Sequence, residues 1–426
     1  MKIKNVRLRE EGDYIFLEAE CKIRHIGTDR VYFKFEKKYR DFLVADACPF
    51  AAALLVPSMK MGQDLIIEGR VSKKLLEGMN DVMEKMLSWP IKLKRINIIA
   101  TEATEDPWLI TSYSGAFFSG GVDSFYTYLR HKYQGEKPDY LILANGFDIS
   151  LDNPGLWEET CKMADDIAEK ESVDMIKVES NIRSLIEPVE IWDYTHGGCL
   201  AAIGLALRNK LSTVYVPSSL AYGQLLPWGS HPELDSLWST EAISFCHDGA
   251  DMRRVDKVRF ISRDPLALEN LRVCYINAEG KFNCGVCDKC LRTMINLRIA
   301  DRLEEAHTFP SKLDKDLVAG ITISGQQNAI LHRENLNELE ERGIEPEIQD
   351  ILRQKLDEFE HPRLTFQKLI SKSRYYLEES LNEIRQLDFF YNQDRLYKSK
   401  KAVTQGFRKN RGNFREKISS IEKVLL

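Results

Sequence analysis

Alternating apolar and polar residues mark the first part of the chain. The segments DYIFLEAECKI (residues 13–23) and RVYFKFEKKY (residues 30–39) follow a period of two, which indicates half-buried strands. Residues 64–87 have the pattern of a strand followed by a helix, and Ile96–Ala103 that of another strand. We therefore expect residues 1–108 to form an N-terminal α+β domain, and we find no catalytic motif in it.

Near Ala116 the pattern changes to short apolar strands that alternate with helices. We expect strands at Ala116–Phe118, Tyr140–Ala144, Met175–Val178 and Thr213–Pro217, and helices at Ser124–Tyr133, Trp157–Glu171 and His196–Asn209. Such an order predicts an α/β, Rossmann-like parallel sheet that is covered on both faces. In sheets of this kind ligands bind at the carboxyl ends of the strands.

Beyond the fourth of these strands the pattern becomes irregular. Residues 221–241 are rich in Gly, Pro, Trp and Ser, and a loop of this length inside an α/β domain suggests a function. Asp251–Leu271 has the pattern of one or two helices, and the chain looks helical from about Glu334 onward. We expect a catalytic domain over residues 109–305 and a helical C-terminal extension with a basic tail over residues 306–426.

Composition and charge restrict the class of protein. The chain has 426 residues and a formal net charge of −5, which gives no global reason to expect nucleic-acid binding. The charged N-terminus does not resemble a secretory signal, and apolar runs such as Ala51–Val56 are too short to span a bilayer. We therefore expect a cytoplasmic protein without membrane association, in which the nine cysteines stay reduced.

The basic tail leaves two interpretations open. Residues 395–426 hold ten Lys/Arg and two Glu. This charge could bind a nucleic acid or an acidic partner, or it could be the solvated face of a helix.

A glycine-rich loop follows the first core strand. The sequence Ser119-Gly120-Gly121-Val122-Asp123-Ser124 joins an apolar strand to a helix, so backbone N–H groups and the helix N-terminus can hold a phosphate. Ser119 and Ser124 can donate hydroxyl hydrogen bonds, whereas Asp123 would hold Mg²⁺ or order the loop. The Gly-Lys-Ser/Thr of a Walker A loop is missing. Gly146, Phe147 and Asp148 end the second strand and should also face the nucleotide. The alternative for residues 119–124 is a tight turn that happens to contain two glycines, and the alternative for residues 146–148 is an ordinary strand-ending turn.

Four cysteines cluster after the predicted helices. Cys274 precedes Cys284, Cys287 and Cys290, and the last three form C-x-x-C-x-x-C. Four thiolates at such spacing suit a tetrahedral, structural Zn²⁺. An iron–sulfur cluster is the main alternative, because four cysteines also hold such clusters. Reduced structural cysteines that bind no metal are the second alternative.

These two motifs together resemble a known family. Residues 119–124 resemble the PP-loop of the ATP pyrophosphatase superfamily, and with the cysteine pattern the chain resembles the QueC family over roughly residues 112–300. QueC enzymes are 7-cyano-7-deazaguanine synthases. The resemblance implies a PP-loop (HUP-type) fold, ATP and a structural zinc knuckle. It also implies adenylation of the carboxylate of 7-carboxy-7-deazaguanine, followed by reaction with ammonia.

The chain departs from the QueC pattern outside its core. It adds about 110 residues before the resemblance and about 120 after it. THGG (residues 195–198), VPSS (216–219) and WGSHPELD (228–235) resemble QueC-like proteins of bacterial anti-phage systems, type IV CBASS and Qat. That subgroup implies an amide with the N-terminal amine of a partner protein encoded nearby, of the nucleotidyltransferase type or another defence protein. Three alternatives stay open: synthesis of the free nitrile from ammonia, a tRNA-modifying PP-loop enzyme, and a non-catalytic zinc scaffold.

Further candidate residues follow from this chemistry. Lys257 and Arg254 precede the knuckle and could reach the phosphates, where cations help adenylation. His196 opens a helix and could polarise a phosphate or a carboxylate. The alternatives are a solvated helix face for the two cations and a capping role for the histidine. For the purine-like ring we expect stacking on Trp228 and contacts with Ser218, Ser219, His231, Asp235 and Glu241, with the carboxylate of Asp235 or Glu241 favoured as the acceptor for the N1–H and 2-amino edge.

Overall fold

The computed structural model describes residues 1–23, 27–107, 112–189, 191–276 and 281–361. Residues 1–360 form one compact unit. The expected boundaries near residues 108 and 305 fall inside this unit, and the division into three domains stays a prediction. The basic tail lies outside the described residues. Among the described residues no helix is both long enough and apolar enough to cross a membrane.

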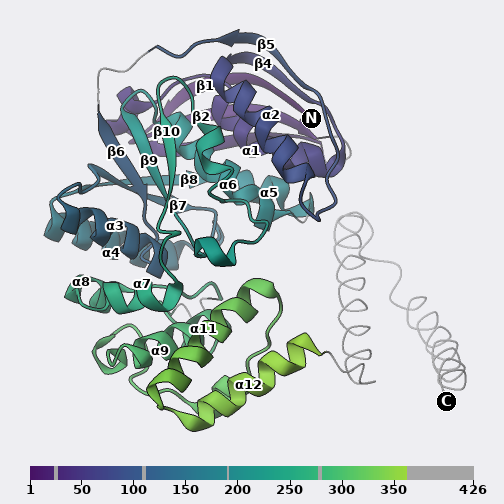
Figure 1. Ribbon diagram of the computed structural model, residues 1–426. Coiled ribbons are helices and arrows are strands. Elements are labelled where there is room, and N and C mark those ends of the chain that lie inside the picture. The colour runs from purple at the N-terminus through teal and green to yellow at the C-terminus, as the bar shows by residue number, and fades with distance from the viewer. Residues whose placement is uncertain (24–26, 108–111, 190, 277–280, 362–426) are drawn as a thin grey trace, which may run out of the picture. The chain divides into compact units, whose positions relative to one another are not determined.

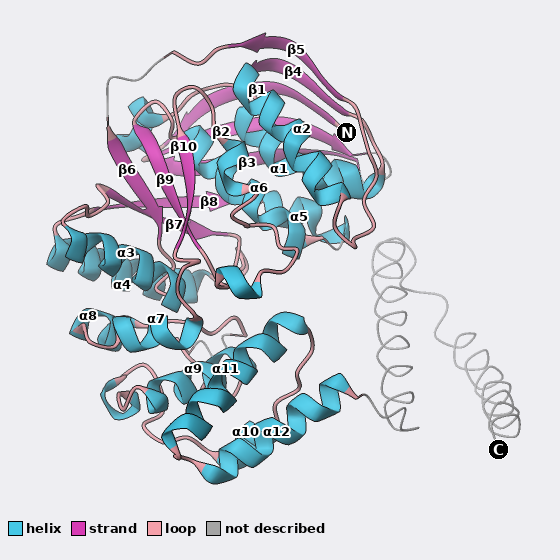
Figure 2. Ribbon diagram, viewed as in Figure 1, coloured by secondary structure: helices cyan, strands magenta, loops and turns pink. Residues whose placement is uncertain are grey.

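The described strands form one ten-stranded mixed sheet in the order β10-β9-β6-β7-β8-β3-β2-β1-β4-β5 (Figures 1 and 2). The first five in this order are mutually parallel, as the alternation of strands and helices predicts. The strands are β1 (Lys2–Glu11), β2 (Tyr14–Ile23), β3 (Gly27–Glu36), β4 (Leu65–Ser72), β5 (Ile98–Thr104), β6 (Tyr113–Phe117), β7 (Tyr140–Asn145), β8 (Asp174–Ser180), β9 (Leu211–Pro217) and β10 (Ser244–Asp248).

The N-terminal strands extend this sheet instead of forming a separate one. β3 pairs antiparallel with β8, and Phe33 lies opposite Ser180. β1, β2 and β3 form an antiparallel meander, and β4 and β5 add to its far edge in parallel. The sequence indicated these strands, but the pattern of a single strand does not show which distant strand it pairs with.

Twelve α-helices occur in the described part of the chain. They are α1 (Cys48–Met61), α2 (Lys73–Leu87), α3 (Val122–Gln134), α4 (Pro154–Glu171), α5 (Ile182–Ile186), α6 (Trp192–Ala206), α7 (Arg254–Ile261), α8 (Pro265–Asn270), α9 (Asp288–Ile299), α10 (Lys315–Ala319), α11 (Gln326–Arg342) and α12 (Pro346–Glu360). The last three confirm the expected C-terminal helices.

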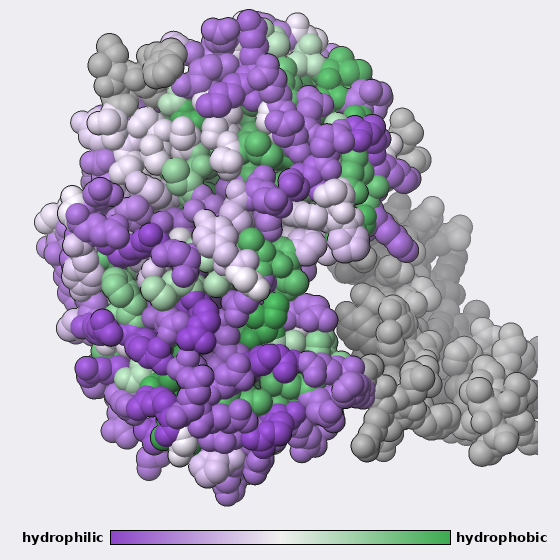
Figure 3. Space-filling view, viewed as in Figure 1, coloured by the Kyte–Doolittle hydropathy of each residue, from purple (hydrophilic) through white to green (hydrophobic). Residues whose placement is uncertain are grey.

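Apolar side chains pack into one core on each face of the sheet. Along β7, Ile142 joins the core under α1, α2 and α6, whereas Leu141 and Leu143 join the core under α3 and α4. The two cores arise because successive side chains of a strand point to opposite faces. The second core continues into α9, α11 and α12. On the face drawn in Figure 3, apolar residues form only small areas within a largely hydrophilic surface.

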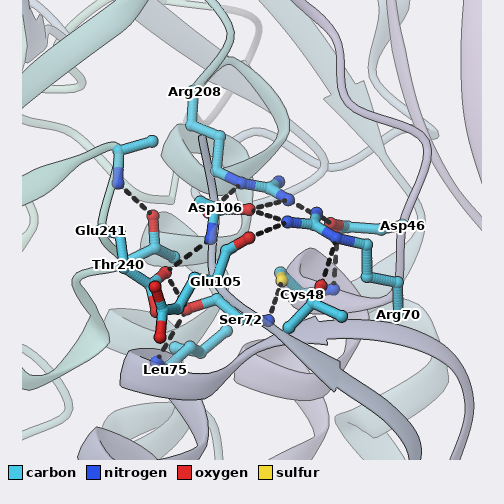
Figure 4. Close-up of polar contacts among 12 residues, drawn as sticks. Asp46, Cys48, Arg70, Ser72, Leu75, Glu105, Asp106, Arg208, Thr240 and Glu241 are labelled. Carbon is cyan, nitrogen blue, oxygen red and sulfur yellow. Dashed lines mark hydrogen bonds and ion pairs between the residues drawn. The ribbon is translucent and has the colours of Figure 1, made fainter. Parts of the chain in front are cut away.

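A buried ion-pair network joins the N-terminal strands to the parallel core (Figure 4). Arg208, just after α6, pairs with Asp46 and with Asp106, whose Oδ2 lies 2.8 Å from Nε. Arg70 of β4 pairs with the same two carboxylates at 2.7 and 2.6 Å. The side chains of Arg208, Asp46 and Asp106 are at most 3% exposed. Each buried charge is therefore balanced by a partner, which is what burial requires.

Candidate functional site

A cavity of about 590 Å³ lies at the carboxyl ends of the parallel strands. Its wall includes the glycine loop, the start of α6, the ends of β7 and β9, and residues of α7, α9 and α11. A parallel sheet of this kind binds ligands at that edge. Of the residues singled out in the sequence, twelve line the cavity: Ser119, Gly121, Val122, Asp123, Ser124, Phe147, Asp148, His196, Ser219, Trp228, Arg254 and Cys274.

The glycine loop is held in shape by its own groups. Gly120 has a φ of +75°, a conformation that favours glycine, and its carbonyl accepts a hydrogen bond from the Arg272 N–H at 2.7 Å. The Ser124 hydroxyl donates to the Gly121 carbonyl at 3.0 Å and accepts from the Ser119 N–H at 3.3 Å. Helix α3 begins directly after Gly121, so its N-terminus faces the cavity. This arrangement suits an anion.

Asp123 is engaged by two cations. Its Oδ2 accepts a hydrogen bond from Arg254 Nη1 at 2.9 Å, and its Oδ1 lies 3.5 Å from Lys257 Nζ. Burial would raise the pKa of Asp123, but the charges of Arg254 and Lys257 outweigh it and hold that pKa low. Of the two roles expected for Asp123, ordering the loop agrees with these contacts.

Lys257 does not line the cavity. It is fully buried, and its ammonium donates to the Ser218 carbonyl at 2.5 Å. Burial lowers the pKa of Lys257, and the attraction of Asp123 opposes that shift. The side chain joins the loop that follows β9 to the carboxylate of Asp123. The structure thus gives it a supporting position instead of the direct contact with phosphate that we expected.

Five cationic side chains line the cavity: Arg183, Arg254, Arg272, Lys289 and Arg292. Burial, together with the neighbouring charge of Arg254, lowers the pKa of Arg292 to about 10. The Nε atoms of Arg254 and Arg292 are buried and have no hydrogen-bond partner among the described residues. Two nearby guanidinium groups that are only partly paired favour a ligand with several negative charges.

At the end of β7 the three candidates differ. Gly146 does not line the cavity; a Cβ there would come 2.0 Å from the Ser180 carbonyl oxygen, so it permits a close approach of two strand ends. Phe147 and Asp148 line the cavity. Burial would raise the pKa of Asp148, but Lys289, Arg272 and Arg183 lower it, so this carboxylate is ionised among cations.

Aromatic rings also line the cavity. Phe147 and Trp192 lie 5.3 Å apart between ring centroids, Trp192 and His196 6.3 Å, and His196 and Trp228 5.5 Å. Asp193 lines the cavity as well, and its carboxylate has no hydrogen bond or ion pair among the described residues. Flat apolar faces with one free carboxylate suit a planar heterocycle that carries N–H donors.

His196 lines the cavity with both ring nitrogens occupied. Its Nε2 accepts a hydrogen bond from the Ser230 N–H at 3.3 Å, and its Nδ1 lies 3.3 Å from the Trp192 carbonyl oxygen. Burial lowers the pKa of His196. The ring is therefore neutral, with the hydrogen on Nδ1, and it fixes the position of Ser230.

Four candidates for substrate contact lie outside the cavity wall. The Ser218 hydroxyl donates to the Leu220 carbonyl at 2.7 Å, and His231 packs against Trp89 at 5.2 Å. Asp235 is buried behind Ser230 and is hydrogen-bonded to it. Glu241 accepts from the Ser72 hydroxyl at 2.7 Å and lies at the start of α2 (Figure 4). None of these four side chains lines the cavity and each has an internal partner, so their expected contacts with a purine-like ring stay predictions.

The four cysteines of the knuckle come together. Their Sγ atoms all lie within 4.8 Å of one another, with Cys274 and Cys287 at 3.8 Å and Cys284 and Cys290 at 3.9 Å. A tetrahedral zinc with Zn–S bonds of about 2.3 Å separates its sulfurs by about 3.8 Å. The set could therefore hold zinc. Gly285 permits the turn with a φ of +72°, and Cys287 precedes the first turn of α9.

The knuckle is built into the cavity wall. Cys274 and its neighbours Val273 and Tyr275 line the cavity, as do Asp288 and Lys289 next to Cys287. Asp288 accepts from fully buried His332 of α11, with Nε2 and Oδ1 2.6 Å apart. A metal at the cysteines would therefore hold part of this wall in place.

Several residues that line the cavity were not expected from the sequence. They are Arg183, Trp192, Asp193, Ser230, Arg272, Lys289 and Arg292, together with Gln327, Asn328 and Leu331 of α11. Lys289 and Arg292 lie within five residues of Cys287, and this closeness was the one signal that pointed to them. Ser230 lies within the WGSHPELD segment (residues 228–235), and the others occur in no recognisable motif.

No family model, curated protein or solved structure matches this chain. The chemistry of the site must therefore be argued from its own residues.

Proposed function

We propose that this protein is an ATP-dependent ligase that adenylates a carboxylate and transfers the acyl group to an amine. The proposed carboxylate is that of 7-carboxy-7-deazaguanine or a similar deazapurine, and the proposed acceptor is the N-terminus of a partner protein in anti-phage defence. The observation that carries the proposal is the glycine loop opening into a cavity whose wall carries both clustered cations and aromatic rings.

The cationic side chains support binding of a triphosphate. The loop 119–124 and the N-terminus of α3 offer N–H groups, while Arg254 and Arg292 add partly unpaired guanidinium groups. Such groups stabilise the charge that develops on the phosphates as the bond between the α- and β-phosphates breaks. Asp148 is the free carboxylate among these cations, and we propose it as the ligand of Mg²⁺.

The aromatic side chains support binding of the acyl donor. Trp192, Trp228 and Phe147 offer faces on which a planar ring can stack, and Asp193 can accept hydrogen bonds from an N1–H and a 2-amino group. In the first step the substrate carboxylate attacks the α-phosphorus and pyrophosphate leaves. In the second step an amine attacks the acyl carbon, the bond to AMP breaks and an amide forms.

The cysteines are proposed to hold a structural zinc. Four thiolates complete a tetrahedral shell and leave no open position for catalysis. Sulfur separations near 3.8 Å favour a single ion over an iron–sulfur cluster, in which several metal atoms spread the ligands farther apart.

The experiment is ATP–pyrophosphate exchange with purified full-length protein and 7-carboxy-7-deazaguanine. Exchange should depend on the carboxylate, and Arg292→Ala should lower its rate at least about tenfold, since a lost charged hydrogen bond costs about 1.5–3 kcal/mol. Arg263→Ala, at an exposed position just after α7, is the matched control and should behave as the unsubstituted chain.

Other results would favour the alternatives. A free nitrile formed from ammonia and ATP alone would support nitrile synthesis in place of protein modification. Lack of exchange with any deazapurine carboxylate, in protein that is folded and metal-loaded, would contradict the proposal. If a co-expressed partner gains the acyl mass in cells and loses it with Arg292→Ala, the protein acceptor is supported.

A further inference from the structure

We infer that Ser230, Asp235 and His247 form a proton relay that opens into the cavity and accepts the proton of the attacking amine. The inference rests on the proposed function, because it concerns the second, amide-forming step. It differs from the expected role of Asp235 as a contact of the substrate ring.

Ser230 is the part of the relay that reaches the cavity. Its hydroxyl donates to Asp235 Oδ2 at 2.7 Å, which leaves the lone pairs of its oxygen able to accept a hydrogen bond. His247 Nδ1 lies 2.7 Å from the same Oδ2 and 3.5 Å from the Ser230 hydroxyl oxygen. Because an ionised carboxylate only accepts, Nδ1 carries the hydrogen that it shares with Asp235.

Asp235 and His247 are buried behind Ser230, with side chains 2% and 5% exposed. No Lys or Arg forms an ion pair with Asp235 in the described part of the chain, where His247 is its one partner of that kind. His247 Nε2 is buried and has no hydrogen-bond partner among the described residues. The carboxylate of Asp235 therefore lies between the Ser230 hydroxyl and the imidazole of His247, which is the chain of hydrogen bonds that a relay needs.

The backbone around Ser230 packs closely against α6. A Cβ on Gly197 would come 1.9 Å from the Gly229 carbonyl oxygen, and one on Gly229 would come 2.8 Å from His196 Nδ1. The loop thus packs against the first turns of α6 at a distance that only glycines permit. The Ser230 N–H also donates to His196. Both contacts hold the Ser230 hydroxyl at one place on the wall.

Other bases on the wall are less suited to the transfer. The Nε2 lone pair of His196 is used by Ser230, and Asp123 is bound by Arg254 and Lys257. Asp148 lies among cations, which make a carboxylate a weak base. Asp193 has a free carboxylate and is the one competitor that the test must separate from the relay.

The amine lone pair forms the bond to the acyl carbon, and the bond from that carbon to the AMP oxygen breaks. The proton of the amine passes to the Ser230 oxygen while the Ser230 proton passes to Asp235. AMP leaves with the electron pair, and Asp235 later returns the proton through the Ser230 hydroxyl to solvent in the cavity.

The test compares two nucleophiles with full-length, metal-loaded protein, ATP and 7-carboxy-7-deazaguanine. Ammonium must lose a proton to react, whereas hydroxylamine is largely unprotonated at neutral pH and traps the acyl adenylate without a base. We expect Ser230→Ala to lower the rate of amide formation from ammonium chloride at least about tenfold, in the range of general base catalysis. ATP–pyrophosphate exchange and hydroxamate formation should change less than about twofold, and Ser230→Thr should restore amide formation.

His247→Gln should give the same separation if it melts at the same temperature as the unsubstituted chain. Equal loss of exchange, hydroxamate and amide in Ser230→Ala would overturn the relay and indicate a structural role, as would full amide formation in that variant. Selective loss of amide formation in Asp193→Asn, with Ser230→Ala unaffected, would assign the base to Asp193 instead. If the unsubstituted chain shows no exchange, the proposed function fails, and the relay in amide transfer fails with it.

Discussion

The buried charged side chains of this protein fall into two groups, one fully paired and one partly paired. Arg208, Asp46 and Asp106 are nearly inaccessible and satisfy one another. Arg254 and Arg292, which line the cavity, are also buried, but the Nε of each has no hydrogen-bond partner among the described residues. Complete pairing is typical of a structural network, and incomplete pairing of a binding site.

Replacing Arg208 should destabilise the fold strongly. Arg208→Met leaves two buried carboxylates with Arg70 as their remaining cation, and removal of one member of a buried pair costs about 3–5 kcal/mol. Urea unfolding measures the free energy of unfolding. Arg95→Ala, which removes an exposed pair with Glu84, should leave it nearly unchanged. A loss in Arg208→Met no larger than in Arg95→Ala would contradict the structural role of the network.

The same network predicts how stability depends on pH. Burial would raise the pKa of Asp106, but Arg208 and Arg70 lower it below the unfolded value of about 3.9. Its stabilisation is therefore present above that value and is lost as pH falls through the lower, folded pKa. In Arg208→Met only Arg70 remains to oppose the effect of burial on the pKa of Asp106, so that pKa should be higher. Stability should therefore begin to fall at a higher pH. Thermal melts from pH 7 to pH 3 measure this, and identical profiles for both proteins would rule it out.

The environments of three carboxylates could not be predicted from the sequence. Asp193, Asp235 and Glu241 are three carboxylates near the start of α6 or in the long loop, and only Asp193 is free to meet a ligand. Whether a carboxylate faces solvent, a ligand or another side chain depends on distant partners such as Ser72. The residues near Glu241 in the sequence do not indicate those partners.

At the scale of elements, the short knuckle before α9 connects metal binding to the cavity. With zinc held by the cysteines as proposed, Cys287→Ser should lower the metal content and the melting temperature, since metal binding contributes directly to folding. Because Tyr275 and Lys289 lie beside the ligands, ATP binding should weaken as well. Elemental analysis and calorimetry measure both effects.

Cys246→Ser is the control for that substitution, since this thiol is exposed on the edge strand β10. It should keep both the metal and the melting temperature. Full zinc content in Cys287→Ser would contradict the assignment of the site.

Most elements of the parallel core could be predicted, because their sequence signals are local. The glycine loop, the apolar strand β7 and helix α4 lie within a few residues of the expected positions. The short edge strand β10 was missed, since Ser244–Asp248 has only two strongly apolar positions. The role of α11 in the cavity was missed too, because contacts such as Asn328 with Arg292 join segments that are distant in the sequence.

At the scale of the whole molecule, the cavity needs the C-terminal helices. Gln327, Asn328 and Leu331 complete its wall, and Leu336 and Leu339 bury themselves in the second core. A chain that ends at residue 305 should therefore expose part of that core, aggregate and fail to bind ATP. A chain that ends at residue 360 keeps every described lining residue and should bind ATP. Binding measured by calorimetry tests both chains, and loss of binding in the longer one would contradict this division.

The pairing of β3 with β8 has a consequence for synthesis on the ribosome. The edge of β3 stays open until the residues opposite it, around Ser180, have been made. At about 5–20 residues per second, that delay lasts roughly 7–30 seconds. During this time a nascent three-stranded meander presents an unpaired edge, which is where strands of other chains add on. The protein's yield in cells should therefore depend on the speed of translation and on chaperones that shield this edge, even though the finished sheet covers it.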